Sequence, residues 1–194
     1  MYSATYFPSH HHLVRIGSHG VTSIELLITL AILGVLAALA APGFKPLIDR
    51  WRIRQVTEGL KAALYFARSE AIKRGGNITI QKLPNKTGNC NTAIDTSDWD
   101  CGWLVCLDSN NDGTCAAKEV VLQRYDAPAN VQITRTSGSA SIKFNRWGLV
   151  DGKWPGFSLV PMNQSTMNPA ALGLCMSSGG RIRVIPPEAI PCSP

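Results

Sequence analysis

Apolar residues follow three patterns along this chain, and the first is an unbroken run. Sixteen uncharged, almost wholly apolar residues extend from Leu26 to Ala41. Residues 21–24 lengthen the run on the other side of Glu25, to roughly the 20 residues that a helix needs to cross a membrane. The sequence therefore predicts a transmembrane helix over residues 21–42, with one carboxylate near its start. A charge in such a segment is costly in lipid and needs a partner or a function.

The second pattern is an amphipathic helix. Pro42, Gly43 and Pro46 interrupt the apolar run, so we expect a kink or a locally melted segment there. From Leu47 onward apolar residues recur at steps of three and four, which predicts one buried stripe. Gly75 and Gly76 supply the end, so the amphipathic helix is expected within residues 43–76. The stripe comprises Ile53, Val56, Leu60, Ala63, Leu64, Ala67 and Ala71.

The third pattern begins after Gly76, where short runs of β-branched and aromatic residues alternate with Gly, Asn, Asp and Ser clusters. Such runs are typical of strands in a mostly antiparallel sheet. A long helix followed by strands predicts an α+β fold, with the helix packed on the sheet of a β-rich domain over residues 77–194. The expected strands are NITIQKL, GWLVCLD, EVVLQRYD, NVQITRT, SIKFNRWGLV, GFSLVPM, ALGLCM and RIRVIP.

Composition bounds the function classes. Beyond the apolar run about 150 residues remain, enough for one domain with its own core. The net charge is +6, and residues 1–20 contribute only Arg15, so the rest carries 18 basic and 13 acidic side chains, a formal +5. A moderate positive charge permits a polyanionic partner without requiring one.

All six cysteines lie beyond the apolar run, and their even number favours disulfides formed in an oxidising compartment. Zinc is the alternative, but there is no CxxC pair and no histidine near them. Proximity along the chain favours the pairs Cys90–Cys101, Cys106–Cys115 and Cys175–Cys192.

Residues 1–20 are polar and hold all four histidines, including the run His10-His11-His12. A histidine run can bind metal, but a leader peptide without a structural role is the simpler interpretation, because an apparent processing site follows it. The segment differs from an ordinary secretory signal, since the cleavable glycine precedes the apolar run.

The segment Gly20-Val21-Thr22-Ser23-Ile24-Glu25, followed by the apolar run, resembles the class III signal of type IV prepilins and type II secretion pseudopilins. The resemblance implies that a prepilin peptidase cuts between Gly20 and Val21 and methylates Val21. The family usually has Phe after the glycine, so Val21 is a mild departure. Glu25 would then pair with the terminal ammonium of a neighbouring subunit inside a fibre core. A plain signal-anchor with a stray glutamate is the alternative.

Further landmarks make the whole chain similar to the GspH/FimT family of minor pilins and pseudopilins. This resemblance implies a type IV pilin-like fold, held in the bacterial inner membrane by residues 21–42 with the C-terminal domain in the periplasm, and other major and minor pilins or pseudopilins as partners in the assembled fibre. The landmarks are Ala67–Arg74, Trp99, Gly102–Val105, Asp108–Gly113, Phe144, Gly148, Cys175 and Gly180–Arg183.

A calcium loop is one candidate site. Asp108, Asn110, Asp112 and Glu119, with Gly113, match the spacing of an EF-hand loop, whose oxygens encircle a cation. The flanks predict strands rather than helices, and Asn, Asp and Gly are also what a long hairpin turn uses. We therefore favour the turn and expect no cofactor, with calcium as the alternative.

The second candidate is a DNA-binding site. Gly180-Arg181-Ile182-Arg183 matches the C-terminal Gly-Arg-x-Arg motif that is implicated in DNA binding by FimT-type minor pilins of naturally competent bacteria. In an extended strand, Arg181 and Arg183 project to the same side and can contact phosphates. Lys143, Arg146 and Lys153 are candidate extensions of this patch. A solvated strand face with two arginines is the alternative.

An enzyme is not expected. Once residues 1–20 are removed no histidine remains, so Ser-His and Cys-His dyads are excluded. We interpret the chain as a minor type IV pilin that is incorporated into or primes a pilus and binds double-stranded DNA for uptake. The alternatives are a minor pseudopilin H of the type II secretion system and a DNA receptor whose incorporation into a fibre is incidental.

Overall fold

The computed structural model describes residues 20–192, apart from the side chains of residues 40–42. The chain divides into two units, Met1–Pro42 and Gly43–Pro194. The predicted leader therefore lies outside the described residues except for Gly20, and so do all four histidines.

One long helix, α1, runs from Ser23 to Arg74 and has 52 residues. The backbone remains helical through Pro42 and Gly43. Among the described residues no single helix is long and apolar enough to cross a membrane. The stretches Ser23–Leu39 and Gly43–Arg74, separated by a short break, meet the length and composition criteria only as a pair.

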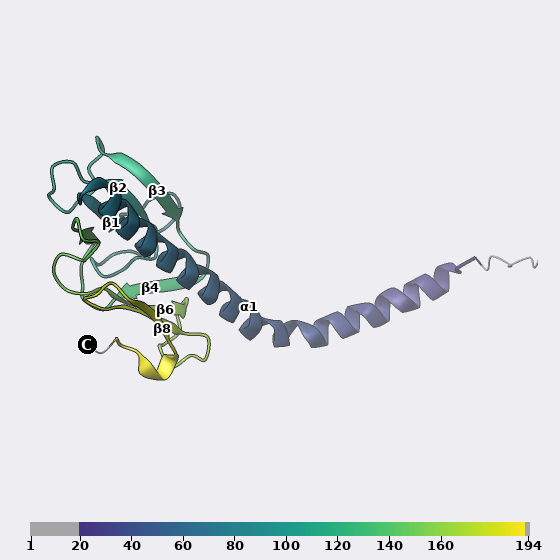
Figure 1. Ribbon diagram of the computed structural model, residues 1–194. Helices are drawn as coiled ribbons and strands as arrows, with labels where there is room; N and C mark the ends of the chain where they lie inside the picture. Colours follow the sequence, from purple (N-terminus) through teal and green to yellow (C-terminus); the bar gives the residue numbers. More distant parts are fainter. Residues whose placement is uncertain (1–19, 193–194) are drawn as a thin grey trace, which may run out of the picture. The chain divides into compact units, whose positions relative to one another are not determined.

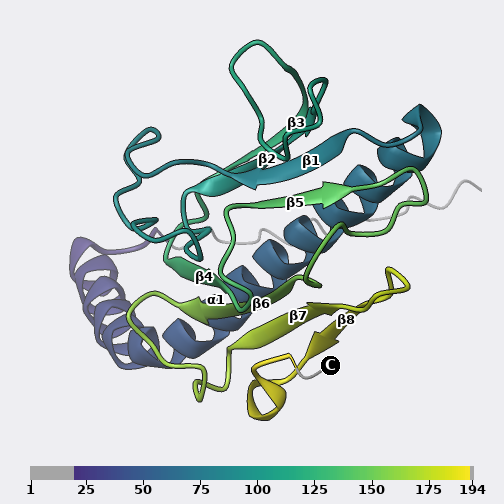
Figure 2. The ribbon, with the colours of Figure 1, turned by 90° about the vertical axis from the view of Figure 1, so that its left-hand side faces the viewer.

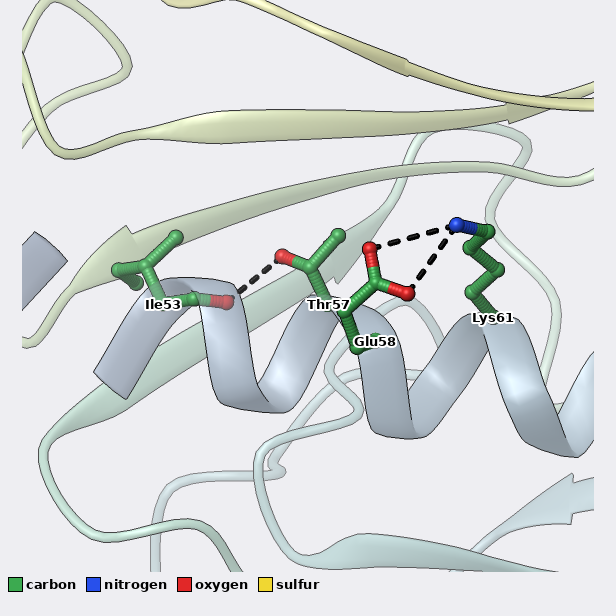
Figure 3. A network of polar contacts seen from close by, with 4 residues as sticks. All are labelled: Ile53, Thr57, Glu58 and Lys61. Atoms are coloured by element: carbon green, nitrogen blue, oxygen red, sulfur yellow. Dashed lines mark hydrogen bonds and ion pairs between the residues drawn. The ribbon is translucent and has the colours of Figure 1, made fainter. Parts of the chain in front are cut away.

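The second stretch of α1 is amphipathic, as the sequence predicts. Its apolar stripe is buried, with Ile53, Leu60 and Ala67 fully excluded from solvent. Figure 3 shows one buried and one exposed contact within two turns of this helix. The buried Thr57 hydroxyl donates to the Ile53 carbonyl oxygen at 2.7 Å, whereas Glu58 and Lys61 form an ion pair at the surface. The helix ends at Gly75 and Gly76, both with positive φ, and the Gly76 N–H donates to the Ala71 carbonyl oxygen at 2.7 Å.

Each of the eight expected runs contains one strand. The strands are β1 (Ile78–Lys82), β2 (Gly102–Leu107), β3 (Val120–Asp126), β4 (Val131–Arg135), β5 (Ser141–Phe144), β6 (Gly156–Pro161), β7 (Leu172–Met176) and β8 (Ile182–Ile185), and a short 3₁₀ helix, η1 (Pro187–Ala189), follows them. β5 is shorter than its run because residues 145–149 turn, with the Asn145 N–H donating to the Leu149 carbonyl oxygen at 2.9 Å.

The strands form two antiparallel sheets rather than the single sheet expected from the sequence. One has the order β3-β2-β1-β5 and the other β4-β6-β7-β8. The second stretch of α1 runs along both sheets (Figures 1 and 2). Its stripe shares one buried cluster with Ile80 of β1, Ile133 of β4 and Leu159 of β6. A single helix face therefore holds the two sheets together.

Aromatic pairs fill this core. Trp99 packs edge-on against Phe157 with ring centroids 5.1 Å apart, and Trp103 stacks on Tyr125 at 5.2 Å. Gly102, which precedes Trp103, has φ +91°, and a Cβ there would overlap the backbone carbonyl of Tyr125. The Gly-Trp pair thus lets β2 approach β3 closely while its indole enters the core.

Candidate functional site

Of the two arginines of the Gly-Arg-x-Arg segment, Arg183 lies on the edge strand β8 and Arg181 directly precedes it. β7 and β8 form a hairpin whose turn is Ser177–Gly180, and among the described strands β8 is the last of its sheet (Figure 2). The Ser177 N–H donates to the Arg181 carbonyl oxygen at 2.9 Å, and the Gly180 N–H donates to the Ser177 carbonyl oxygen at 2.9 Å. The turn is therefore closed by its own backbone.

The side chains at the start of β8 alternate between core and surface. Ile182 is buried, whereas Arg181 and Arg183 on either side of it are exposed. Within residues 20–192, no ion pair or side-chain hydrogen bond involves either guanidinium. The strand thus presents two cationic groups, each with free donors, on the side opposite Ile182.

Arg68 of α1 supports the hairpin turn. Its guanidinium donates to the carbonyl oxygens of Gly180 at 2.7 Å and Gly179 at 3.3 Å. Gly180 has φ +78°, and a Cβ there would overlap this guanidinium. Glycine therefore serves both the turn and the contact with the helix.

A groove of about 680 Å³ lies beside Arg183. It is bordered by the segment just after β4, the segment just before β6, the end of β7 and the Cys175–Cys192 disulfide. The lining residues are Thr136, Ser137, Gly152, Lys153, Trp154, Pro155, Gly156, Cys175, Met176, Ser177, Ser178, Arg183 and Cys192. Lys153 and Arg183 thus line the same groove.

The other two candidate patch residues do not line this groove. Lys143 belongs to β5 in the other sheet, and its ammonium donates to the Asn111 carbonyl oxygen at 2.9 Å. Arg146 is exposed in the turn after β5, where its backbone lies against Gly76. Their positions along the chain gave no sign of this separation.

Three disulfides form, with the pairing that proximity favours: Cys90–Cys101, Cys106–Cys115 and Cys175–Cys192. Cys90–Cys101 packs with Leu83 and Ala93 in a small cluster of its own. Cys175–Cys192 ties the segment after β8 back to β7, where Gly156 leaves room for the Cys192 sulfur. No described cysteine is free.

The Asp108–Glu119 segment forms a tight loop whose carboxylates bind the loop itself. Asp108 is fully buried and accepts from the Thr79 hydroxyl at 3.0 Å and from the N–H groups of Asp112 at 3.0 Å and Gly113 at 2.8 Å.

The remaining oxygens of this loop are engaged in the same way. Glu119 accepts from the N–H groups of Ser109 at 2.7 Å and Ala116 at 2.9 Å, and Asn110 donates to Asp112 at 2.7 Å. The Thr114 hydroxyl lowers the pKa of the Asp112 carboxyl by hydrogen bonding. Among the described residues no group of three or more His, Cys, Asp or Glu is arranged to hold a metal ion. The geometry is that of the hairpin turn.

At the start of α1, Glu25 has a local partner. The Glu25 N–H donates to the Thr22 hydroxyl at 3.3 Å, and the Thr22 N–H donates to the Glu25 carboxylate at 3.5 Å. This reciprocal pair is a capping box. Gly20 and Val21 precede the helix, and both are exposed.

Several contributors to these sites were missed by sequence reasoning. Thr22 was recoverable, because Thr-x-x-Glu before an apolar run is the capping-box pattern. Trp154 was harder to recognise, because its only sign of a role at the groove was an aromatic ring next to Lys153. Arg68 gave none, since 112 residues separate it from Gly180.

Known proteins support this description. The family model described as "Type II transport protein GspH" matches residues 56–185. Two crystal structures of the type IV minor pilin FimU from Pseudomonas aeruginosa have a similar fold. One is 24% identical with a TM-score of 0.51 and coverage of 70% of this chain and 94% of that chain. The other is 23% identical with a TM-score of 0.54 and coverage of 73% and 94%. A search among curated proteins finds no match. Because the family match spans more than half of the chain, this chain belongs to the GspH family, and it has the fold of a type IV minor pilin.

Proposed function

We propose that this chain is a minor type IV pilin that binds double-stranded DNA for uptake through Arg181 and Arg183. The observation that carries the proposal is the pair of exposed guanidinium groups at the start of β8, one on the residue before the strand and one within it, with no partner among the described residues. Phosphate oxygens match such donors, and contacts of this kind give affinity that is independent of sequence and sensitive to salt.

The proposal includes processing and assembly. A prepilin peptidase removes residues 1–20 after Gly20 and methylates Val21, and residues 21–42 hold the chain in the inner membrane. In the fibre, Glu25 pairs with the terminal ammonium of a neighbouring pilin, because either charge alone would be costly in an apolar environment. Residues 43–76 and 77–194 then form the periplasmic domain. Support comes from the Gly20–Glu25 signal, the apolar run and membership of the GspH family.

The second candidate is a minor pseudopilin H of a type II secretion system. The name of the matching family, a type II transport protein, favours it. A pseudopilin would share the stem and the fold, but it would have no need of DNA. The two candidates therefore differ at Arg181 and Arg183, and a binding measurement separates them.

The test is fluorescence anisotropy of a short labelled DNA duplex with the full chain in a neutral detergent. We expect the double substitution Arg181→Ala/Arg183→Ala to weaken binding more than tenfold. It should also reduce the slope of log affinity against log salt by about two, one for each lost phosphate contact. The matched control, Arg50→Ala/Arg54→Ala, removes the same charge from exposed positions of α1. Absence of binding at low salt, or equal losses in both variants, would rule out the DNA proposal and leave the secretion role.

A further inference from the structure

The groove beside Arg183 is large enough for a small ligand. Its volume of about 680 Å³ lies within the range of roughly 300–1,000 Å³ typical of small-molecule sites. The Cys175–Cys192 disulfide and Gly156 form part of its lining, and a Cβ on Gly156 would meet the Cys192 sulfur at 2.9 Å. A small residue and a covalent link therefore fix one side of the cavity.

Backbone hydrogen bonds hold the segment that carries Trp154. The Gly156 carbonyl oxygen accepts from the Thr136 N–H at 2.8 Å, and the Pro155 carbonyl oxygen accepts from the Met176 N–H at 3.0 Å. Residues 155 and 156 are thus bonded to two neighbouring segments, which fixes the backbone next to Trp154.

A buried arginine holds the wall after β4. The Arg135 guanidinium donates to the Ser137 hydroxyl at 3.0 Å and to the carbonyl oxygens of Ser139 at 3.0 Å and Ser141 at 2.6 Å. Burial lowers its pKa to about 10, so it remains charged at neutral pH and keeps these bonds. The hairpin turn that contributes Ser177 and Ser178 to the lining is held by Arg68. The backbone of both segments is therefore fixed before a ligand binds, which reduces the entropy cost of binding.

The chemistry of the lining is specific. Lys153 and Arg183 supply two cations, and none of the described residues that line the groove has a carboxylate. The Trp154 indole is 47% exposed, although a large aromatic side chain gains from burial. Ser137 and Ser177 add hydroxyl groups. A ligand that complements this set has a flat apolar part, polar edges and negative charge.

We propose that the groove holds one unpaired nucleotide of single-stranded DNA, with its base stacked on Trp154 and its flanking phosphates at Lys153 and Arg183. Base–aromatic stacking beside a cationic groove is how single strands are held without sequence preference. Bases inside a duplex are already stacked and cannot enter. The groove therefore adds a preference for unpaired strands to the phosphate contacts of the proposed function, on which this inference rests.

The experiment compares a labelled oligothymidylate with a blunt duplex by anisotropy, using the full chain in a neutral detergent. We expect Trp154→Ala to weaken binding of the oligothymidylate about tenfold and binding of the duplex less than twofold. Trp154→Phe retains a stacking ring and should keep most of the affinity, which separates loss of stacking from loss of folding. Trp147→Ala is the matched control, because Trp147 is 71% exposed and does not line the groove. It should change neither affinity.

The outcomes separate this inference from the proposed function. If Trp154→Ala leaves oligothymidylate binding unchanged, the groove assignment is wrong, while duplex binding that depends on Arg181 and Arg183 still supports the proposed function. If the oligothymidylate depends on Trp154 but the duplex does not depend on the arginines, the groove assignment holds and the duplex contact is wrong. Polyglutamate that binds equally well and depends equally on Trp154 would assign the groove to acidic peptides. No binding of either DNA overturns both.

Discussion

The guanidinium of Arg68 donates a hydrogen bond of 2.7 Å to the carbonyl oxygen of Gly180, which follows it by 112 residues. This contact joins α1 to the turn that precedes the two exposed arginines. Gly180 adopts φ +78°, and its missing Cβ leaves the space that the guanidinium occupies. The contact between Gly180 and Arg68 therefore ties the residue before Arg181 to the helix.

Gly180→Ala should lower the free energy of unfolding. Alanine is strained at this φ, and its Cβ would displace the Arg68 guanidinium from two carbonyl groups. Together these effects predict a loss of about 1–3 kcal/mol, measured by urea unfolding. The matched control is Gly179→Ala, where a Cβ meets nothing within 4 Å. A stability change of the same size in both variants would contradict the role of the Arg68 contact.

The Cys175–Cys192 disulfide should stabilise both the fold and the groove. It closes a segment with a sequence separation of 17, for which chain entropy predicts about 3 kcal/mol. The double substitution Cys175→Ala/Cys192→Ala should lower the free energy of unfolding by about that amount and weaken oligothymidylate binding. Cys106→Ala/Cys115→Ala is the control, because this pair does not line the groove. It should lower stability without changing DNA affinity; the reverse result would argue against the disulfide as part of the site.

Asp108 should act as a structural residue of its loop and not as a calcium ligand. Asp108→Ala leaves the Thr79 hydroxyl and the Gly113 N–H without their acceptor, while the Asp112 N–H keeps a longer bond to the Asn110 side-chain oxygen at 3.3 Å. We expect a loss of about 1–3 kcal/mol in urea unfolding, because the Thr79 hydroxyl is fully buried and would lose its acceptor. Calcium should not raise the unfolding midpoint of the unsubstituted chain. A midpoint that increases with calcium concentration would show a bound ion.

The sequence predicted features that depend on neighbouring residues better than features that depend on contacts between distant parts of the chain. The buried stripe of α1, from Ile53 to Ala71, follows from a helical period within one segment, and it was predicted correctly. The strands follow from alternation and turn residues in the same way. The division of the strands into two sheets does not follow from such a local pattern, because it depends on which strands pair. β1 pairs with β5 through Thr79 and Lys143, for example, and local pattern carries no information about that choice.

The candidate site shows the same limit. Alternation correctly placed Arg181 and Arg183 on the surface on either side of a buried Ile182. Only the fold brings Lys153 to the groove of Arg183 and directs Lys143 to Asn111 instead. Their charge alone made Lys143 and Lys153 equal candidates for the patch around Arg183.

Asp100 should make stability depend on pH. Its carboxyl is 4% exposed and accepts from the Ile133 N–H at 2.6 Å. Burial raises the pKa of Asp100 above its ordinary value of 3.8. The folded chain therefore holds the Asp100 proton more tightly than the unfolded chain does. As a result, the contribution of Asp100 to the free energy of unfolding is most favourable below pH 3.8 and declines as pH rises through the folded pKa.

Asp100→Asn keeps the acceptor oxygen but removes the titration. Relative to the unsubstituted chain, its free energy of unfolding should improve as pH rises above 3.8. Urea unfolding in a series of buffers from acid to neutral pH measures this difference. Asp126→Asn, which removes a surface carboxyl, controls for the change in net charge. Parallel curves for the Asp100 variant and the unsubstituted chain would contradict a raised pKa.

Glu25 has two separable roles, a helix cap and the proposed assembly charge, and two substitutions distinguish them. Glu25→Gln keeps a side-chain oxygen for the Thr22 N–H but removes the charge, whereas Thr22→Val removes the capping hydroxyl and keeps the charge. If Glu25 pairs with the terminal ammonium of a neighbouring subunit, Glu25→Gln should strongly reduce the amount of chain in fibres sheared from cells that assemble them. Thr22→Val should be incorporated nearly normally, because losing one cap costs only about 1 kcal/mol. Immunoblots of the sheared and cell-bound fractions give both quantities. Normal incorporation of Glu25→Gln, together with a loss in Thr22→Val, would show that the cap, and not the charge, is what assembly requires.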